Sequence, residues 1–202
     1  MEPKEPWEKR WALGHTDWDI GAAHPLCDEA LDLAIKEGGL ASGGHFLVPG
    51  CGRGHEVGYL SKRGFRADGI DFVPQAIREA QSLYGKFDGV RFSVEDVFQG
   101  NGDRDYDGII DRAMLCAIQP EARTSYIEAM GKRLRSGGLF IGLLFADLDS
   151  GLNQGPPYKL DEREVSDLFL DQFDLVAWES HPNHATPSVV LKTWLCIWRK
   201  KS

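Results

Sequence analysis

The sequence has few cysteines, and their positions argue against a metal or disulfide site. Its 4 cysteines among 202 residues stand far apart, at positions 27, 51, 116 and 196, and no two form a CxxC pair. Zinc sites and disulfide frameworks both depend on closely spaced or numerous cysteines. The pattern is typical of reduced thiols in the cytoplasm, and no metal site is expected.

Runs of basic residues and long apolar runs are also missing. The chain carries 23 Lys and Arg against 31 Asp and Glu, a formal net charge of −8, so a surface for nucleic acid or anionic lipid is not expected. The longest apolar run, residues 139–146, is far too short to cross a bilayer, and the first residues lack the apolar core of a signal peptide. We therefore expect a cytoplasmic protein without nucleic-acid or membrane partners, and favour a monomer.

A chain of 202 residues predicts one domain, because this length can bury about 70% of the unfolded surface. From residue 45 onward, short apolar runs alternate with helical patterns, which predicts a doubly wound, mostly parallel α/β sheet. We expect residues 45–202 to form this Rossmann-like core and residues 1–44 to form a helical extension.

The expected elements follow from the apolar periodicity and from the turn residues that bound it. Pro74 is placed to start a helix, and Ser136-Gly137-Gly138 to end one. A His-, Pro- and Asn-rich connection without a helical pattern joins the last two strands, which predicts an antiparallel pair. The predicted strands cover residues 45–49, 66–72, 90–94, 106–112, 139–145, 173–179 and 191–198, and the predicted helices 53–63, 74–84, 121–134 and 161–170.

Glycine is abundant, at 23 residues, and three glycines stand together in the run Val48-Pro49-Gly50-Cys51-Gly52-Arg53-Gly54. This glycine-rich turn, residues 48–54, follows the first predicted strand and opens a helix, where an open parallel sheet binds nucleotide-like ligands. Because glycine has no Cβ atom, a ligand can approach its backbone closely. The spacing GxGxG differs from the GxGxxG of dinucleotide sites, and no P-loop GK[ST] follows. A plain tight turn is the alternative.

Two acidic residues at neighbouring strand ends strengthen the ligand hypothesis. Asp71 ends the second predicted strand 21 residues beyond Gly50, where an acid can accept both ribose hydroxyls. Asp96 follows the third strand, beside the expected place of an adenine ring. Either acid could instead cap a turn. The three strand ends together predict an adenosine cofactor, and a cationic one such as S-adenosyl-L-methionine suits an acidic site lined by aromatic rings.

Half of the 6 tryptophans lie in the first 18 residues. Trp7 and Trp11 share one face of a predicted helix, and Trp18 follows in a turn. They could simply dock the extension on the core. Their spacing and five further motifs resemble the thiopurine S-methyltransferase superfamily, closest to its halide and thiol methyltransferase branch. The further motifs are GHTDWD at 14–19, VPGCGRG at 48–54, EDVF at 95–98, DRAMLCAIQP at 111–120 and GPPY at 155–158.

The resemblance implies the class I methyltransferase fold, a seven-stranded sheet with an antiparallel last strand, and an N-terminal segment that closes over S-adenosylmethionine. Tyr158 matches a residue at the cofactor and substrate pocket. Arg112 matches the thiopurine-type branch, whereas GPPY matches the halide and thiol branch, so the sequence mixes the two. The positions expected to bind the cofactor are Trp7, Trp11, Trp18, Gly50, Gly52, Asp71, Asp96, Val97 and Asp111.

The implied reaction is an in-line displacement at the sulfonium methyl group by a small soft nucleophile: a thiol, bisulfide, a halide or thiocyanate. We assign the catalytic roles to Tyr158 and Arg112, whose guanidinium could hold an anionic substrate. An ion pair of Arg112 with Asp111 or Asp71 is the alternative. Thiopurines and tellurium or selenium oxyanions are the alternative acceptors. A protein that binds the cofactor without turnover is a third hypothesis.

Overall fold

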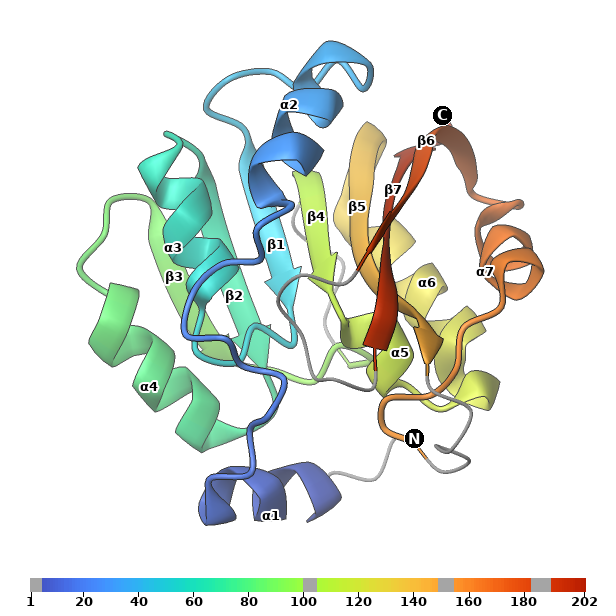
Figure 1. Cartoon of the computed structure of the whole chain (residues 1–202). Helices are drawn as coiled ribbons and strands as arrows, with labels where there is room; N and C mark the ends of the chain where they lie inside the picture. The colour runs from blue at the N-terminus through green and yellow to red at the C-terminus, as the bar shows by residue number, and fades with distance from the viewer. Residues whose placement is uncertain (1–4, 100–104, 149–154, 183–189) are drawn as a thin grey trace.

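The computed structural model describes residues 5–99, 105–148, 155–182 and 190–202. Its seven strands form one sheet in the order β3-β2-β1-β4-β5-β7-β6 (Figure 1). Strands β1 to β5 run parallel, and β7 pairs antiparallel with both β5 and β6, which confirms the expected sheet with its antiparallel last strand. The strands are β1 His45–Pro49, β2 Arg66–Asp71, β3 Val90–Val94, β4 Tyr106–Arg112, β5 Leu134–Leu148, β6 Phe173–Pro182 and β7 Val190–Lys200.

Helices cover both faces of the sheet. Buried residues of α2, α3 and α4 pack on one face, and those of α5, α6 and α7 on the other. Helix α1 lies across the edge where β1 and β4 end, at the bottom of Figure 1. No helix within the described ranges has the length and apolar character needed to span a membrane. The helices are α1 Glu5–Leu13, α2 Cys27–Lys36, α3 His55–Lys62, α4 Pro74–Tyr84, α5 Met114–Ala117, α6 Arg123–Arg133 and α7 Glu162–Phe169, with the 3₁₀ turn η1 Pro120–Ala122.

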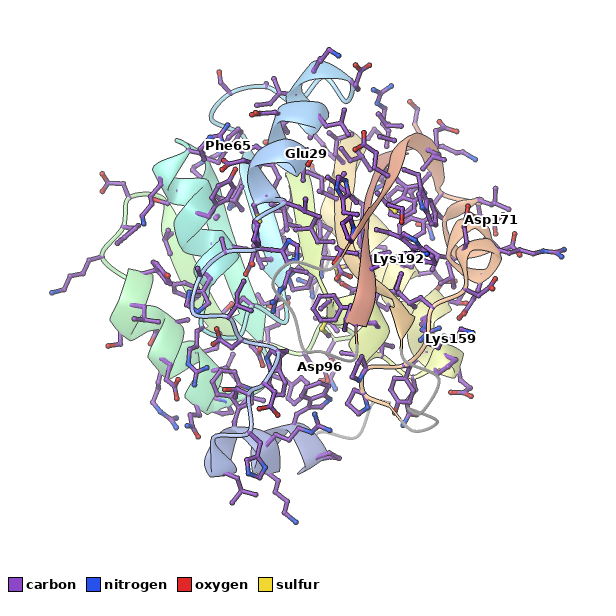
Figure 2. All side chains as sticks on the ribbon, viewed as in Figure 1. Glu29, Phe65, Asp96, Lys159, Asp171 and Lys192 are labelled. Atoms are coloured by element: carbon purple, nitrogen blue, oxygen red, sulfur yellow. The ribbon has the colours of Figure 1, made fainter. Side chains whose placement is uncertain are left out.

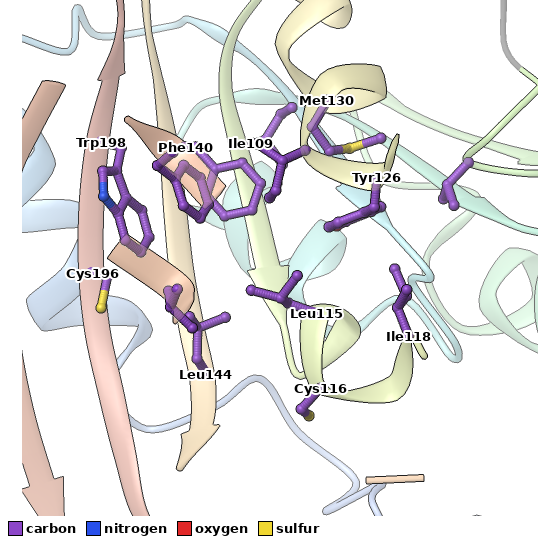
Figure 3. Packing of buried hydrophobic residues seen from close by; sticks show 14 of the residues in the cluster. Ile109, Leu115, Cys116, Ile118, Tyr126, Met130, Phe140, Leu144, Cys196 and Trp198 are labelled. Atoms are coloured by element: carbon purple, nitrogen blue, oxygen red, sulfur yellow. The ribbon is translucent and has the colours of Figure 1, made fainter. Parts of the chain in front are cut away.

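Burial on both faces explains why the central strands are apolar almost throughout. Successive residues of β1 alternate, since Phe46 and Val48 pack with α2 and α3 while Leu47 faces the opposite cluster. Figure 3 shows that opposite cluster, which contains Phe140 of β5 and Trp198 of β7 together with residues of α5 and α6. Side chains of both clusters come from the same strands. Packing on both faces therefore holds these strands, and with them their ends, in fixed positions.

Most expected elements are present, with shifted boundaries. The helix expected from residue 53 begins at His55, because Gly54 before it has a φ of 77°, which lies outside the helical region. Strand β5 begins at Leu134 instead of 139, and its pairing with β4 shifts register near Gly137, whose φ is 73°. The Ser-Gly-Gly segment is therefore an irregularity within a strand, as in a β-bulge. Helix α6 ends before it, at Arg133.

Two further features differ from the expectation or cannot be compared with it. The four-residue helix α5 follows β4 directly and was not predicted, because it is too short to carry an apolar period. Residues 183–189, which contain most of the expected His-, Pro- and Asn-rich connection, lie outside the described residues. The paired strands β6 and β7 on either side of this connection run antiparallel, as expected.

Candidate active site

A cavity of about 370 Å³ opens where β1, β2 and β4 end, and the N-terminal segment, residues 5–24, covers part of it. Figure 2 places Asp96 at this edge of the molecule, near α1. The position is the one at which open parallel sheets bind ligands. Nine of the expected site residues line it, namely Trp7, Trp11, Trp18, Gly50, Gly52, Asp71, Asp96, Val97 and Arg112.

The glycine-rich turn forms the wall of the cavity next to β1. Its three glycines have positive φ angles, 57° at Gly50, 52° at Gly52 and 77° at Gly54, a region that side chains strain. A Cβ atom on Gly50 would lie 2.5 Å from the Sδ atom of Met114, which also lines the cavity. The turn therefore requires glycine, and it presents backbone to whatever occupies the cavity.

Asp71 and Asp96 each combine the two roles that the sequence left open. The Asp71 carboxylate accepts hydrogen bonds from the backbone amides of Gly52 at 3.1 Å and Val73 at 2.9 Å. Asp96 accepts one from the amide of Phe98 at 3.0 Å. Both side chains thus cap turns, and both line the cavity. Burial raises the pKa of Asp71, and the two amides act against this increase.

The three N-terminal tryptophans pack against one another over the cavity. The rings of Trp7 and Trp18 meet edge to face with centroids 5.3 Å apart, and those of Trp11 and Trp18 at 6.4 Å. Trp11 is buried against Val73 and Ala76 of the core. The tryptophans therefore dock the extension on the core and line the ligand cavity at the same time.

A charged cluster that sequence reasoning missed holds the N-terminal segment in place. The guanidinium of Arg53 donates to Asp19 at 2.5 Å and to Glu79 on α4 at 2.7 Å, and it lies 5.0 Å above the Trp11 ring. His55 contacts the second carboxylate oxygen of Asp19 at 3.1 Å. Burial alone would raise the pKa of Asp19, but the hydrogen bonds with His55 and Arg53 outweigh it and hold this pKa well below its usual range.

Two of the expected residues lie outside the cavity lining. Asp111 is fully buried behind the wall, where its carboxylate accepts from the Met114 amide at 2.7 Å and the Tyr126 hydroxyl at 2.9 Å. Burial raises the pKa of Asp111 to about 6. The described contacts of Asp111 therefore hold the start of α5, and the cofactor contact that the resemblance implied stays a prediction.

Tyr158 is the second expected residue that lies outside the cavity lining. Its neighbours Pro156 and Pro157 line the cavity, whereas Tyr158 itself is not part of the lining. Its backbone amide donates to the carbonyl oxygen of Cys116 at 2.6 Å. This bond ties the Gly-Pro-Pro-Tyr segment to α5, so the described contacts of Tyr158 position the wall and do not place the residue at a reacting atom.

Arg112 reaches the cavity, and no carboxylate of the described residues forms an ion pair with it. Its guanidinium lies 5.5 Å above the ring of Phe145, which also lines the cavity. The Nε and Nη2 atoms are buried, and neither has a hydrogen-bond partner among the residues that the structure describes. The alternative ion pair with Asp111 or Asp71 is thus not formed. A buried guanidinium without a partner is costly, so this side chain is suited to receive an anionic group.

The model of the thiopurine S-methyltransferase family matches residues 2–193 of the chain. The chain belongs to this family. Membership confirms the family resemblance and makes the protein a methyltransferase that uses S-adenosylmethionine. The fold agrees, because the chain superimposes on NodS, an N-methyltransferase from Bradyrhizobium japonicum in complex with S-adenosylhomocysteine, with a TM-score of 0.76, 17% identity and 98% of each chain covered.

Relatives from both branches of the family are similar to this chain. Thiocyanate methyltransferase 1 of Arabidopsis thaliana is 34% identical over 198 residues, which cover 96% of this chain and 84% of the relative. The thiopurine S-methyltransferase of Pseudomonas entomophila (strain L48) is 30% identical over 183 residues, with 82% of this chain and 81% of the relative covered. The mixture of branch motifs in the sequence is thus reflected in the relatives.

The residues of the cavity fit S-adenosylmethionine. Gly50 and Gly52 carry no Cβ atom and therefore expose backbone to the cavity, and the buried Asp71 carboxylate is accessible from it. Five acidic residues and three tryptophans line the space, an arrangement that favours a cationic ligand. Because Gly52 donates its amide to Asp71, the turn and the acid form one binding unit.

Two alanine variants separate backbone strain from obstruction of the cavity. Gly50 and Gly64 both have positive φ, 57° and 83°, so each alanine should cost about 1–2 kcal/mol of unfolding free energy. At Gly64 no atom lies within 4 Å of the added Cβ, whereas at Gly50 Met114 must move. By calorimetry we expect S-adenosylmethionine to bind Gly50→Ala at least about tenfold more weakly, a change of about 1.4 kcal/mol, and Gly64→Ala normally. Equal affinities would contradict the assignment of the turn.

Asp71→Ala should impair cofactor binding, and Asp68→Ala provides its control on the same strand. Both acids are buried, and Asp68 accepts from the Tyr106 hydroxyl at 2.9 Å. Each substitution leaves donors without an acceptor and should cost about 1–3 kcal/mol of unfolding free energy. We expect only Asp71→Ala to weaken S-adenosylmethionine binding by more than about tenfold. An unchanged affinity in Asp71→Ala would remove this residue from the site.

Arg53→Met should release the N-terminal segment, whereas Arg63→Met, which breaks pairs with Asp28 and Asp32 at the other end of α3, should not. We expect greater acrylamide quenching of tryptophan fluorescence and weaker cofactor binding only in Arg53→Met. Because the pKa of Asp19 is lowered in the folded state, its contribution to stability is complete above about pH 4 and is lost at lower pH. Equal quenching in both variants would show that the cluster does not hold the segment.

Proposed function

We propose that this methyltransferase transfers a methyl group to a small soft nucleophile, with thiocyanate, bisulfide, halides and thiols as the acceptor class. The observation that carries the proposal is the unpaired guanidinium of Arg112 in the wall of the cavity. It provides positive charge in a protein whose formal net charge is −8. The relatives named thiocyanate methyltransferase and probable thiol methyltransferase support the same acceptor class.

The order of the strands suggests how the cofactor is held. Asp96 and Val97, after β3, are placed to bind the adenine, and Asp71, at the end of β2, to bind the ribose. The glycine-rich turn after β1 then lies beneath the remaining part of the molecule. When bound, S-adenosylmethionine supplies a methyl group on a cationic sulfur that leaves as a neutral thioether.

The chain contributes positioning and exclusion of water. Arg112 holds an anionic group against Phe145, and the tryptophans with Pro156 and Pro157 cover part of the cavity and limit the access of water. Correct orientation of reactants can lower a barrier by up to about 7–11 kcal/mol. Soft anions attack without a general base, and a thiol with a pKa of about 8.5 is partly ionised near neutral pH. In this mechanism Tyr158 acts as a positioning residue, through its bond to Cys116.

Thiopurines and tellurium or selenium oxyanions form the second candidate acceptor class. Arg112, in the motif DRAMLCAIQP, favours this class, and so does the similarity to the Pseudomonas thiopurine S-methyltransferase. The same guanidinium would serve an oxyanion or an ionised thiopurine. The two classes differ in the size and volatility of their products, which makes them separable by experiment.

The remaining expectations on partners and location form part of the proposal. We propose a monomer that acts on small molecules, without nucleic-acid or membrane partners, as the acidic composition suggests. The four cysteines are buried and unpaired, which supports a reducing compartment such as the cytoplasm.

The acceptor class is tested in sealed vials. The protein is incubated with S-adenosylmethionine and thiocyanate, iodide or bisulfide, and gas chromatography of the headspace measures methyl thiocyanate, methyl iodide or methanethiol. We expect a volatile product from at least one acceptor, at a rate above that for 6-mercaptopurine, selenite and tellurite. Methylation of 6-mercaptopurine alone would assign the protein to the thiopurine class.

Arg112→Met tests whether Arg112 binds an anion, and Arg112→Lys is the matched variant that keeps the charge. We expect Arg112→Met to raise KM for thiocyanate by about tenfold or more, because Arg112 holds the nucleophile in this proposal. Weaker binding of S-adenosylhomocysteine with an unchanged KM would instead assign Arg112 to the carboxylate of the cofactor and remove its support for an anionic acceptor. Lysine should recover part of the loss. Unchanged values for both ligands would contradict the anion-binding role.

A further inference from the structure

Glu56 places a further buried carboxylate in the cavity wall, beside Asp71 and Asp96, and the transfer reaction proposed above does not use it. The residue belongs to the first turn of α3, directly after the glycine-rich turn. Its side chain is 6% exposed, and it lines the cavity. One carboxylate oxygen accepts a hydrogen bond from the backbone amide of His24 at 3.1 Å.

This single amide leaves most of the hydrogen-bonding capacity of Glu56 unused. An ionised carboxylate has about four acceptor positions, and burial of a charge is costly without partners. Among the residues that the structure describes, no Lys, Arg or His forms an ion pair with Glu56. The nearby cation Arg53 is already paired with Asp19 and Glu79. Glu56 is therefore suited to receive a cationic hydrogen-bond donor from within the cavity.

The topology indicates which part of the cofactor lies there. In the order β3-β2-β1-β4 (Figure 1), the adenine is assigned to the end of β3 and the ribose to the end of β2. The amino-acid tail beyond the ribose must then extend over β1 and β4. Glu56 follows β1, and Arg112 ends β4. Both residues line the cavity, so the two opposite charges are available to one ligand.

We propose that Glu56 binds the α-ammonium group of the cofactor and of its product. The free carboxylate oxygen would accept a charge-assisted hydrogen bond from this ammonium, while the other oxygen stays on the amide of His24. The residue would then fix the amino-acid tail and, through it, the direction in which the sulfur presents its methyl group. The inference rests on the assigned cofactor and not on the identity of the acceptor.

The test is calorimetric binding to Glu56→Gln, a variant that keeps the shape and the oxygen that accepts from His24. Three ligands are compared: S-adenosylhomocysteine, its analogue that keeps the carboxylate but lacks the amino group, and 5′-methylthioadenosine, which lacks both. We expect Glu56→Gln to weaken S-adenosylhomocysteine by about tenfold or more, since a hydrogen bond between charged groups contributes at least about 1.5 kcal/mol. The other two ligands should bind as they do to the wild type.

Glu95→Gln is the matched control, because Glu95 lies after β3, pairs with Arg133 at 2.6 Å and does not line the cavity. It should bind all three ligands normally. Equal weakening of all three ligands by Glu56→Gln would overturn the proposal and assign the residue a structural role through His24. An unchanged affinity for S-adenosylhomocysteine would overturn it as well. Because no acceptor is present in these titrations, a negative headspace assay leaves their result unaffected.

Discussion

The carboxylate of Asp71 joins two turns that would otherwise be independent. One oxygen accepts from Gly52 in the glycine-rich turn after β1, and the other from Val73 in the turn after β2. Burial raises the pKa of this carboxyl group, and the two amides offset only part of the increase. Since Pro49 and Ile70 are paired neighbours in the sheet, the bonds are short-range, and they fix the ends of both strands. The shape of the cavity, the exposure of its backbone and the place of the ribose all depend on this one side chain.

Acidic residues outnumber arginines around the cavity, which distinguishes cationic from anionic ligands. Arg53 is neutralised by Asp19 and Glu79, whereas Arg112 has no partner in the described part of the chain. Five acids and three arginines line the cavity, so a cationic ligand is favoured over most of the wall and an anion only near the arginines that have no carboxylate partner among the described residues. A neutral thioether loses the electrostatic attraction that a sulfonium has to these acids, and the loss is larger near the buried ones, Glu56, Asp71 and Asp96. The same wall therefore favours the cofactor before transfer more than the product after it.

Features encoded in short stretches of sequence could be predicted, and contacts between distant stretches could not. Alternating strands, the glycine-rich turn and the spacing to Asp71 are local patterns, and the structure contains them all. The contacts of Arg53 with Asp19 and of Glu56 with His24 each join residues more than 30 positions apart, and no periodicity marks such pairs. Asp111 shows a related limit, because a motif identifies a residue without its direction, and here the side chain points behind the cavity wall. Nor does any pattern of spacing place Tyr158 outside the lining.

The N-terminal segment depends on the core for its structure, and this links closure to ligand binding. Helix α1 has 9 residues, and isolated helices shorter than about 12–15 residues are marginal in water. Its stability must come from the packing of Trp11 on Val73 and from the bonds of Arg53 to Asp19. Arg53 belongs to the glycine-rich turn, between two glycines with positive φ, and Val73 donates its amide to Asp71. Any displacement of the turn or of Asp71 would therefore move Arg53 or Val73, the residues that hold the N-terminal segment. The groups assigned to the cofactor thus also determine how far this segment covers the cavity.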